Sequence, residues 1–498
     1  GYVGLVTGTC LANFGLSIIC VDNDKEKIKL LNNGSIPIHE PNLEELIQKN
    51  VEEKRLSFTT DMKRAVEESQ VIYIAVGTPS NHDGSACMQQ VEEVAREIAK
   101  YINGYKVIVN KCTVPVGTAR KIKQIITEYQ ISYGHCESSS SPSPFREDFS
   151  HNPSLSKEDF SNTPSPLSGD LSHTPSPLSG DLSHTPSPLR GEGRVRVKYS
   201  FDIISNPEFL REGSAVYDFT HPDKIVIGYE TEKAKQIMQE IYRPLYLLDT
   251  PFVFTSLETA EMIKYACNAF LATKITFINE IANLCDKVGA DVHQIAKAMG
   301  MDGRISPKFL HPGPGYGGSC FPKDTRALRS IAINENYDFK LLNAVIEVNM
   351  RQRKIVVDKM EKEMRNLNNK RIGILGLAFK QNTDDIRESA ALDIIQMLLQ
   401  KGAIIQCFDP MAMKKTKEIM PELTYCQDEY ETAKDADALV ILTEWDQFRN
   451  LDFNKIKLLM KRHEYGLYFQ PFIFDMKNLY EPEKVKKLDF KYYGIGRS

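Results

Sequence analysis

The sequence lacks the usual marks of a membrane or secreted protein. No run of about 18 or more apolar residues occurs in the 498 residues, and no signal peptide is recognisable. The ten cysteines show no close-spaced framework of the kind that disulfide-rich secreted domains carry. These absences favour a cytoplasmic location, where the cysteines are reduced, and argue against a chain held together by disulfides.

Two further absences restrict what the chain binds. The 62 lysines and arginines nearly balance the 66 acidic residues, and the net charge of −4 gives no overall attraction to nucleic acid or an anionic membrane. The ten histidines form no metal-ligand spacing such as HExxH. We therefore expect no catalytic metal, no nucleic-acid partner and no membrane partner. The length and the 42% hydrophobic content suit two or three globular domains.

The most informative segment is 315–324, GYGGSCFPKD, which places a cysteine between a glycine-rich turn and a helix start. Pro322 suits the first turn of that helix, so Cys320 is expected at its positive end, where a thiolate is favoured. Lys323 adds positive charge, and Asp324 is spaced to share the face of Cys320. These features predict a nucleophile. The alternative is a small buried thiol beside a tight turn.

The chain opens on Gly-Tyr-Val-Gly, followed by a helical pattern and an apolar strand at 18–21 that ends in Asp22. This pattern predicts a GxGxxG dinucleotide fingerprint in which Gly1 and Gly4 are the second and third glycines. In this interpretation the first strand and first glycine are missing from the chain. Asp22 stands at roughly the 20-residue offset of the acid that binds the adenosine ribose, which favours NAD over NADP. Simple helix packing also explains a lone GxxG.

Further strands at 71–76 and 106–110 alternate with helices near 91–101 and from 117 onward. This alternation predicts a doubly wound parallel sheet with ligands at the carboxyl ends of the strands. Thr78 and Thr113 follow two of those ends. Each is a candidate ligand contact, and a helix cap without a ligand role is the equal alternative.

The composition changes sharply between about 136 and 198, where four copies of an 11-residue unit rich in Ser and Pro occur. With almost no aliphatic residues, the segment is predicted to be a disordered insert in a surface loop. A partner-docking tail is one alternative. Metal binding by the repeated histidines His151, His173 and His184 is another.

Two segments beyond the insert carry polar groups suited to catalysis. Residues 201–213 predict a strand leading into a turn with Glu208 and Glu212, whose carboxylates suit acid–base chemistry unless they pair with Arg211 or cap a helix. A long apolar helix over 257–288 presents Lys264 and Asn268 on one face. A lysine in such a context is expected to have a lowered pKa, the alternative being a lysine that extends to the surface.

A third block from 370 predicts strands at 371–377, 404–408 and 438–443, with an amphipathic helix ending at 401. It is a second nucleotide-type α/β unit without a GxGxxG loop. We expect it to bind a phosphorylated ligand other than the dinucleotide. Lys380 and Arg387 are candidate phosphate or cofactor contacts, against the alternative of ordinary surface charge.

Seven motifs in this order, GYVG, VGTP, TVPVGT, SNPEFLREG, the lysine–asparagine helix, GYGGSCFPKD and FKxxTxDxRES, resemble the UDP-glucose/GDP-mannose dehydrogenase family. The resemblance covers nearly everything outside the insert. It implies an α/β fold with two doubly wound Rossmann-like domains joined by a long central helix. The implied domains are an NAD-binding domain at 1–135 with 199–250, the insert at 136–198, a central dimerisation and catalytic-cysteine region at 251–369, and a nucleotide-sugar-binding domain at 370–498.

The resemblance also implies the reaction. The family oxidises C6 of a nucleotide sugar from an alcohol to a carboxylate, with two NAD and one water, and it forms homodimers or higher homo-oligomers. UDP-glucose is the expected substrate. The alternatives are GDP-mannose or a UDP-N-acetylhexosamine, because Met476-Lys477 stands where UDP-glucose relatives usually carry Gly-Arg. A catalytically silent nucleotide-binding or scaffold protein is the alternative from another class.

The roles of single residues follow from the same resemblance. Cys320 is expected to attack the aldehyde formed by the first oxidation, which gives a thiohemiacetal and then a thioester. The other implied catalytic residues are Lys264 and Asn268 at the oxyanion, Asp324 orienting water and lysine, Glu212 as general base, and Glu208 nearby. The implied cofactor contacts are Gly1, Tyr2, Val3, Gly4, Asp22, Lys27, Thr78, Thr113, Lys323 and Arg387. The implied substrate contacts are Phe209, Leu210, Phe309, Leu310, Gly317, Phe379, Lys380 and Arg304, the last reaching a neighbouring subunit's site.

Overall fold

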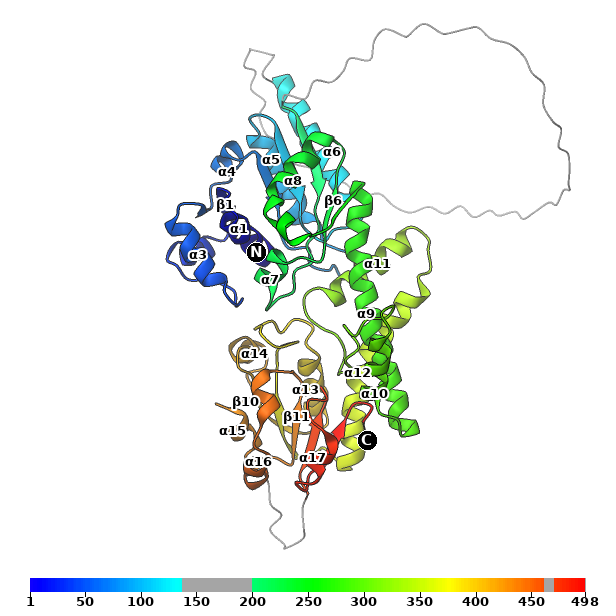
Figure 1. The fold of residues 1–498 in the computed structure, drawn as a ribbon. Coiled ribbons are helices and arrows are strands. Elements are labelled where there is room, and N and C mark those ends of the chain that lie inside the picture. The colour runs from blue at the N-terminus through cyan, green and yellow to red at the C-terminus, as the bar shows by residue number, and fades with distance from the viewer. Residues whose placement is uncertain (137–198, 461–469, 498) are drawn as a thin grey trace, which may run out of the picture. The chain divides into compact units, whose positions relative to one another are not determined.

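The structure is a computed structural model that describes residues 1–136, 199–460 and 470–497. The contacts divide the chain into two units, Gly1–Gln130 with Tyr199–Ser498, and Ile131–Lys198. The first unit holds all the strands of the described residues (Figure 1). The predicted disordered insert, with its three repeated histidines, falls at 137–198 and lies outside the described residues.

The N-terminal α/β region contains two sheets, one parallel and one mixed. β1 (Ile18–Val21) pairs with β2 (Leu56–Thr59) in a two-stranded sheet. A separate sheet has the order β3-β4-β5-β6-β7, in which only the β5 and β6 pair is antiparallel. Its strands are β3 (Val71–Ile74), β4 (Lys106–Asn110), β5 (Phe201–Ser205), β6 (Ile225–Gly228) and β7 (Phe252–Thr255).

Helices connect and cover these strands, and several begin at a residue whose side chain accepts a backbone N–H. Asp24, Asp61 and Thr231 cap α2, α4 and α8 in this way. The helices of this region are α1 (Tyr2–Asn13), α2 (Lys25–Asn32), α3 (Leu43–Glu52), α4 (Met62–Glu68), α5 (Gln89–Tyr101), α6 (Thr118–Cys136), α7 (Ala215–Thr220), α8 (Glu232–Ile241) and a 3-10 helix (Arg243–Leu248).

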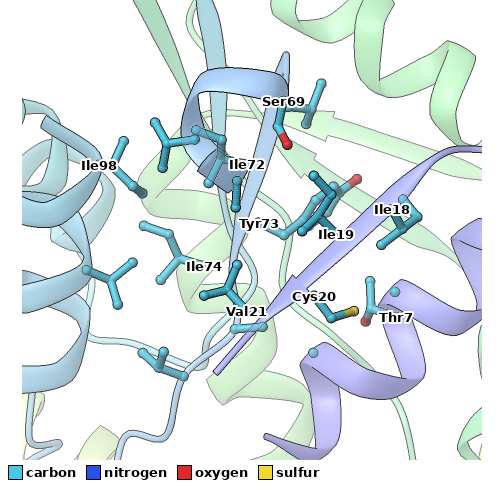
Figure 2. Close-up of a pocket in the computed structure, with 18 of the residues that line it drawn as sticks. Thr7, Ile18, Ile19, Cys20, Val21, Ser69, Ile72, Tyr73, Ile74 and Ile98 are labelled. Carbon is cyan, nitrogen blue, oxygen red and sulfur yellow. The ribbon is translucent and has the colours of Figure 1, made fainter. Parts of the chain in front are cut away.

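A hollow of about 2180 Å³ separates the two N-terminal sheets. Figure 2 shows it between the strand that carries Ile18 to Val21 and the strand that carries Ile72 to Ile74. β1 is hydrogen-bonded to β2 alone and β3 to β4 alone, so each has one unpaired edge.

Four helices form the centre of the chain. α9 (Leu257–Val288) has the bounds predicted from the sequence, begins at a Ser256 side-chain cap and ends at Gly289, which has a φ of 73°. It packs against α11 (Phe321–Asn334) and α12 (Lys340–Met364), and α10 (Val292–Met301) follows it in the chain. α9 is the long green helix of Figure 1.

The C-terminal α/β region has one continuous parallel sheet of six strands in the order β10-β9-β8-β11-β12-β13. Its strands are β8 (Arg371–Leu375), β9 (Ile404–Phe408), β10 (Thr424–Tyr425), β11 (Ala438–Ile441), β12 (Phe472–Asp475) and β13 (Lys491–Gly494). Its helices are α13 (Ala390–Gln400), α14 (Met413–Ile419), α15 (Glu429–Ala433), a 3-10 helix (Asp446–Asn450), α16 (Phe453–Leu459) and α17 (Pro482–Lys486).

The predicted fold class, two doubly wound α/β regions joined by a long helix, is confirmed. Three predicted strands end earlier than expected: the strand predicted at 438–443 is β11, which stops at Ile441, and β3 and β8 also stop early. β3 stops at Ile74, and the N–H of Val76 donates to Cys112 Sγ at 3.2 Å instead of extending the ladder. β8 stops at Leu375 because Gly376 has a φ of 97°. Across the described ranges, no helix combines the length and the apolar character that a membrane span needs.

Candidate active site

Cys320 occupies the N-cap of α11, and Pro322 lies in the first turn, as predicted. The preceding glycines are required by close packing against the segment 379–389. A Cβ on Gly317 would lie 2.2 Å from the carbonyl oxygen of Glu388, and one on Gly318 would lie 2.6 Å from the Phe379 ring. The N–H of Gly318 donates to the carbonyl of Arg387 at 2.9 Å. The cysteine loop is therefore fixed to the C-terminal α/β region.

Lys264 on α9 is buried and forms an ion pair with Glu208, 3.0 Å from Nζ to Oε1. The second carboxylate oxygen of Glu208 accepts the N–H of Leu210 at 2.6 Å. Burial alone would lower the pKa of Lys264, but the charges of Glu208, Cys320 and Asp324 together outweigh it and the pKa is raised. The prediction of a lowered pKa is therefore wrong, and the alternative of a surface lysine is excluded.

Asn268, one turn after Lys264 on α9, contacts the acid of α11. Its Nδ2 donates to Asp324 Oδ2 at 2.6 Å, while Lys323 Nζ donates to Asp324 Oδ1 at 2.5 Å. Asp324 is only 1% exposed. The two helices thus bring Lys264, Asn268 and Asp324 to one place, as the sequence predicted.

The thiol of Cys320 is protonated in this ligand-free protein. Burial raises its pKa to about 11, the negative charge of Glu208 adds to the effect, and Lys264 opposes it. The prediction that the helix N-terminus favours the thiolate is therefore wrong here, because desolvation is the larger effect. A base is needed before the sulfur can act as a nucleophile.

Glu212 lies beside this thiol through Ser319, whose Oγ donates to Glu212 Oε1 at 2.9 Å. Burial and the neighbouring Asp385 raise the pKa of Glu212 to about 7, although Arg387 Nη2 lies 3.2 Å away. The suggestion that a turn carboxylate pairs with Arg211 is wrong, because Arg211 pairs with Asp218. Ser319 was missed by sequence reasoning, although its position next to Cys320 was a signal.

The expected substrate contacts divide into three groups. The ring of Phe209 lies 5.3 Å from Lys264 Nζ. Lys380 Nζ lies 5.5 Å from the Phe379 ring, and burial lowers the pKa of Lys380. Phe309 has a φ of 66° and contacts Phe321, while Leu310 lies within the apolar core. Arg304 is 90% exposed and pairs with Asp302 in its own loop, so the structure does not bring it to Cys320.

The expected cofactor contacts start at the N-terminus of α1. Gly1 is its N-cap and no side chain caps the helix, and Tyr2, Val3 and Gly4 form the first turn. A Cβ on Gly4 would lie 3.4 Å from that of Ala75, so glycine lets the helix approach the end of β3. An uncapped N-terminus of a 12-residue helix suits a pyrophosphate.

Acidic and hydroxyl groups lie at the ends of neighbouring strands. Asp22 follows β1 with Lys27 Nζ 4.0 Å away, which suits a ribose contact. Thr78 Oγ1 donates to the carbonyl of Thr113 at 2.9 Å, so this pair joins the ends of β3 and β4. The residues present fit a nicotinamide dinucleotide, with Lys323 and Arg387 on the side of Cys320.

Sequence reasoning also missed two buried groups that fix the turn 206–213. Glu40 accepts the N–H groups of Gly213 and Ala215, each at 2.7 Å, at one end of the turn. Lys111 Nζ donates to Asn206 Oδ1 at 3.1 Å at the other end, and burial lowers its pKa to about 8. No sequence signal pointed to Glu40, because the contacts join elements far apart in the chain.

Three family models match the chain in order. They describe the NAD-binding, central and UDP-binding domains of the UDP-glucose/GDP-mannose dehydrogenase family, at residues 1–154 with 186–246, 258–351 and 373–482. The expected cofactor, NAD, is therefore confirmed.

Characterised relatives cover the whole chain. A UDP-glucose 6-dehydrogenase of Bacillus subtilis, TuaD, is 42% identical over 498 residues, which are 100% of this chain and 92% of that protein. One from Rhizobium meliloti is 42% identical over 501 residues, which cover 100% and 98%. The solved structure of a UDP-glucose dehydrogenase from Pyrobaculum islandicum has a TM-score of 0.79 and 30% identity, covering 100% of this chain and 96% of that chain. The chain therefore belongs to the UDP-glucose/GDP-mannose dehydrogenase family.

Proposed function

We propose that this chain oxidises UDP-glucose to UDP-glucuronate through a covalent intermediate on Cys320. The observation that carries the proposal is the convergence of two buried donors, Lys264 and Asn268, with the thiol at the start of α11. Full-length relatives named UDP-glucose 6-dehydrogenase support the choice of substrate.

In the first oxidation, Lys264 and Asn268 hold the C6 oxygen of the sugar. Lys264 is positively charged because Glu208 raises its pKa, so it stabilises negative charge that develops on this oxygen. Bound NAD supplies a hydride acceptor for each of the two oxidations. Glu40 and Lys111 hold the two ends of the turn 206–213, and this turn positions Glu208 for its ion pair with Lys264.

In the second half of the reaction, the sulfur of Cys320 bonds to the aldehyde carbon and gives a thiohemiacetal. Its oxidation gives a thioester, which water hydrolyses to the acid. The covalent bond keeps the aldehyde in place while the spent cofactor is exchanged. Asp324 positions Asn268 and Lys323, and Glu212 serves as general base for hydrolysis.

The stoichiometry of NADH formation tests this proposal. With UDP-glucose, we expect two NADH per sugar, and we expect Cys320→Ser to release no acid. Equal turnover in the serine variant would overturn the covalent scheme. No NADH with any nucleotide sugar from the folded protein would instead favour the silent scaffold.

Lys477 is a reason to assay nucleotide sugars other than UDP-glucose in the same way. Its Nζ pairs with Glu444 at 2.7 Å, and a lysine lacks the two-pronged geometry of the arginine that UDP-glucose relatives usually carry here. GDP-mannose and UDP-N-acetylhexosamines therefore belong in the panel. A higher kcat/KM for one of them would reassign the substrate and leave the mechanism in place.

The proposal includes a homodimer formed through α9. This helix exposes apolar side chains at spacings of four to eight residues, Met262, Phe270, Phe277, Leu284 and Val288. Phe270→Asp with Phe277→Asp is expected to convert a dimer to a monomer in light scattering. Ile333→Asp, an equally exposed apolar position on α11, is the matched control. An unchanged mass in the double variant would contradict this interface.

A further inference from the structure

The hydroxyl of Ser319 lies between two ionisable groups that the reaction uses. Its Oγ donates to Glu212 Oε1 at 2.9 Å and lies 3.6 Å from the sulfur of Cys320. The hydrogen atom on Ser319 points to the carboxylate, so its oxygen lone pair is free to accept the thiol proton. The three side chains form a continuous path from the sulfur to the carboxylate.

The other charged groups around Cys320 already have partners. Glu208 is held by Lys264 and by a backbone N–H, and Asp324 is held by Asn268 and Lys323. Lys380 and Arg387 also face the sulfur, but cations do not accept a proton. Within 1–136, 199–460 and 470–497, the side-chain hydrogen-bond partner of the sulfur is Ser319 alone.

The other end of the path is suited to accept a proton at neutral pH. Burial and Asp385 raise the pKa of Glu212 to about 7, and Arg387 limits the rise. Tyr2 and Lys380 are the other titratable groups that face this carboxylate. Near pH 7 the ionised form of Glu212 is therefore well populated, while the thiol of Cys320 remains protonated.

We propose that Ser319 relays the proton of the Cys320 thiol to Glu212. The thiol proton passes to Ser319 Oγ as the hydroxyl proton passes to Glu212 Oε1, which leaves a thiolate, an unchanged serine and a neutral carboxylic acid. A sulfur lone pair then forms the bond to the aldehyde carbon, and the π electrons of the carbonyl move to its oxygen. The second step rests on the proposed function, whereas the proton relay needs no substrate.

Alkylation of Cys320 by iodoacetamide in the ligand-free protein tests the relay directly, with the modified peptide quantified by mass spectrometry between pH 5 and 10. In the unmodified protein, the rate is expected to rise through about pH 7 as Glu212 ionises. Ser319→Ala is expected to remove this rise and slow alkylation at pH 8 by about 100-fold, the lower range for a positioned base. Ser319→Thr keeps the hydroxyl and is expected to restore the rise.

Glu212→Gln supplies a second, independent variant if Ser319→Ala does not fold. It is expected to give the same alkylation profile as Ser319→Ala, and the double variant to react no more slowly than either single one. Ser85→Ala, at a partly buried serine bonded to Asp83, is the matched control and is expected to change nothing.

An unchanged alkylation profile in Ser319→Ala or Glu212→Gln would overturn the relay. A purely structural role for Ser319 predicts that outcome, or equal slowing at every pH. The proposed function fails separately, because a protein that alkylates as expected but forms no NADH with UDP-glucose would retain the relay and lose the substrate assignment.

Discussion

The two α/β regions of this chain differ in how their strands are joined: the C-terminal strands form one continuous sheet, whereas the N-terminal strands form two separate sheets. In the C-terminal sheet, β8 is the first strand in the chain and lies between β9 and β11. In the N-terminal region, the corresponding place between β1 and β3 is the 2180 Å³ hollow. Among the described residues, β8 therefore joins the two halves of the C-terminal sheet, whereas a hollow separates the two N-terminal sheets.

A strand that is paired on both edges is buried more completely than a strand that is paired on one edge. β8 is hydrogen-bonded on both edges, and Ile372, Ile374 and Leu375 are fully buried. β1 is bonded on one edge, and all four of its residues are only partly buried. Equivalent substitutions in the two regions should therefore have unequal effects on stability.

The largest expected effect is in β8. Ile374→Ala should lower the free energy of unfolding of the C-terminal region by about 2 to 5 kcal/mol, because it leaves a cavity in a packed core. Ile19→Ala, which faces the hollow, should cost less than about 1 kcal/mol. Hydrogen exchange of each sheet during urea titration measures the two costs. Equal losses would show that the hollow is as well packed as the C-terminal core.

A strand added to the N-terminal region should remove the difference. Five residues of alternating Val and Ile fused before Gly1 are expected to raise the stability of this region by about 2 kcal/mol, roughly one fully buried apolar side chain. The added strand should protect the amides of β1 and β3 from exchange. A Gly-Ser extension of equal length is the control. If both extensions act alike, the hollow does not accept a strand.

The smallest expected effect concerns pH. Asp385 of the C-terminal region raises the pKa of Glu212, and a general base must be ionised, so kcat/KM should rise with pH through about 7. Asp385→Asn removes the negative charge and lowers that pKa, which should move the acid limb down by about one pH unit. Asp384→Asn, whose side chain pairs with Lys415, is the neighbouring control. If the acid limb of the kcat/KM profile does not move in Asp385→Asn, the charge of Asp385 does not influence the ionisation of Glu212.

The sequence predicted local structure better than electrostatics. Strands 18–21, 106–110 and 404–408 and the helix 257–288 have the predicted bounds, because apolar runs and caps act over short distances. The placement of Cys320 at a helix start was likewise predicted by its neighbours.

Both pKa predictions were wrong for the same reason. The carboxylate that raises the pKa of Lys264 belongs to Glu208, 56 residues earlier in the chain, and the burial that raises the pKa of Cys320 comes from packing of distant elements. The anchoring roles of Glu40 and Lys111 depend on contacts over similarly long separations. A motif identifies the groups present, whereas the fold decides their charge.

The contact between Gly317 and Glu388 has a consequence for the order of events in the catalytic cycle. Since no methyl group fits between these two loops, the Cys320 loop packs directly against the 379–389 segment. In the proposed reaction, a sugar bonded to the sulfur would stay beside that segment while the reduced dinucleotide departs. Retention of the sugar across the two oxidations would then depend on the packing of these two loops.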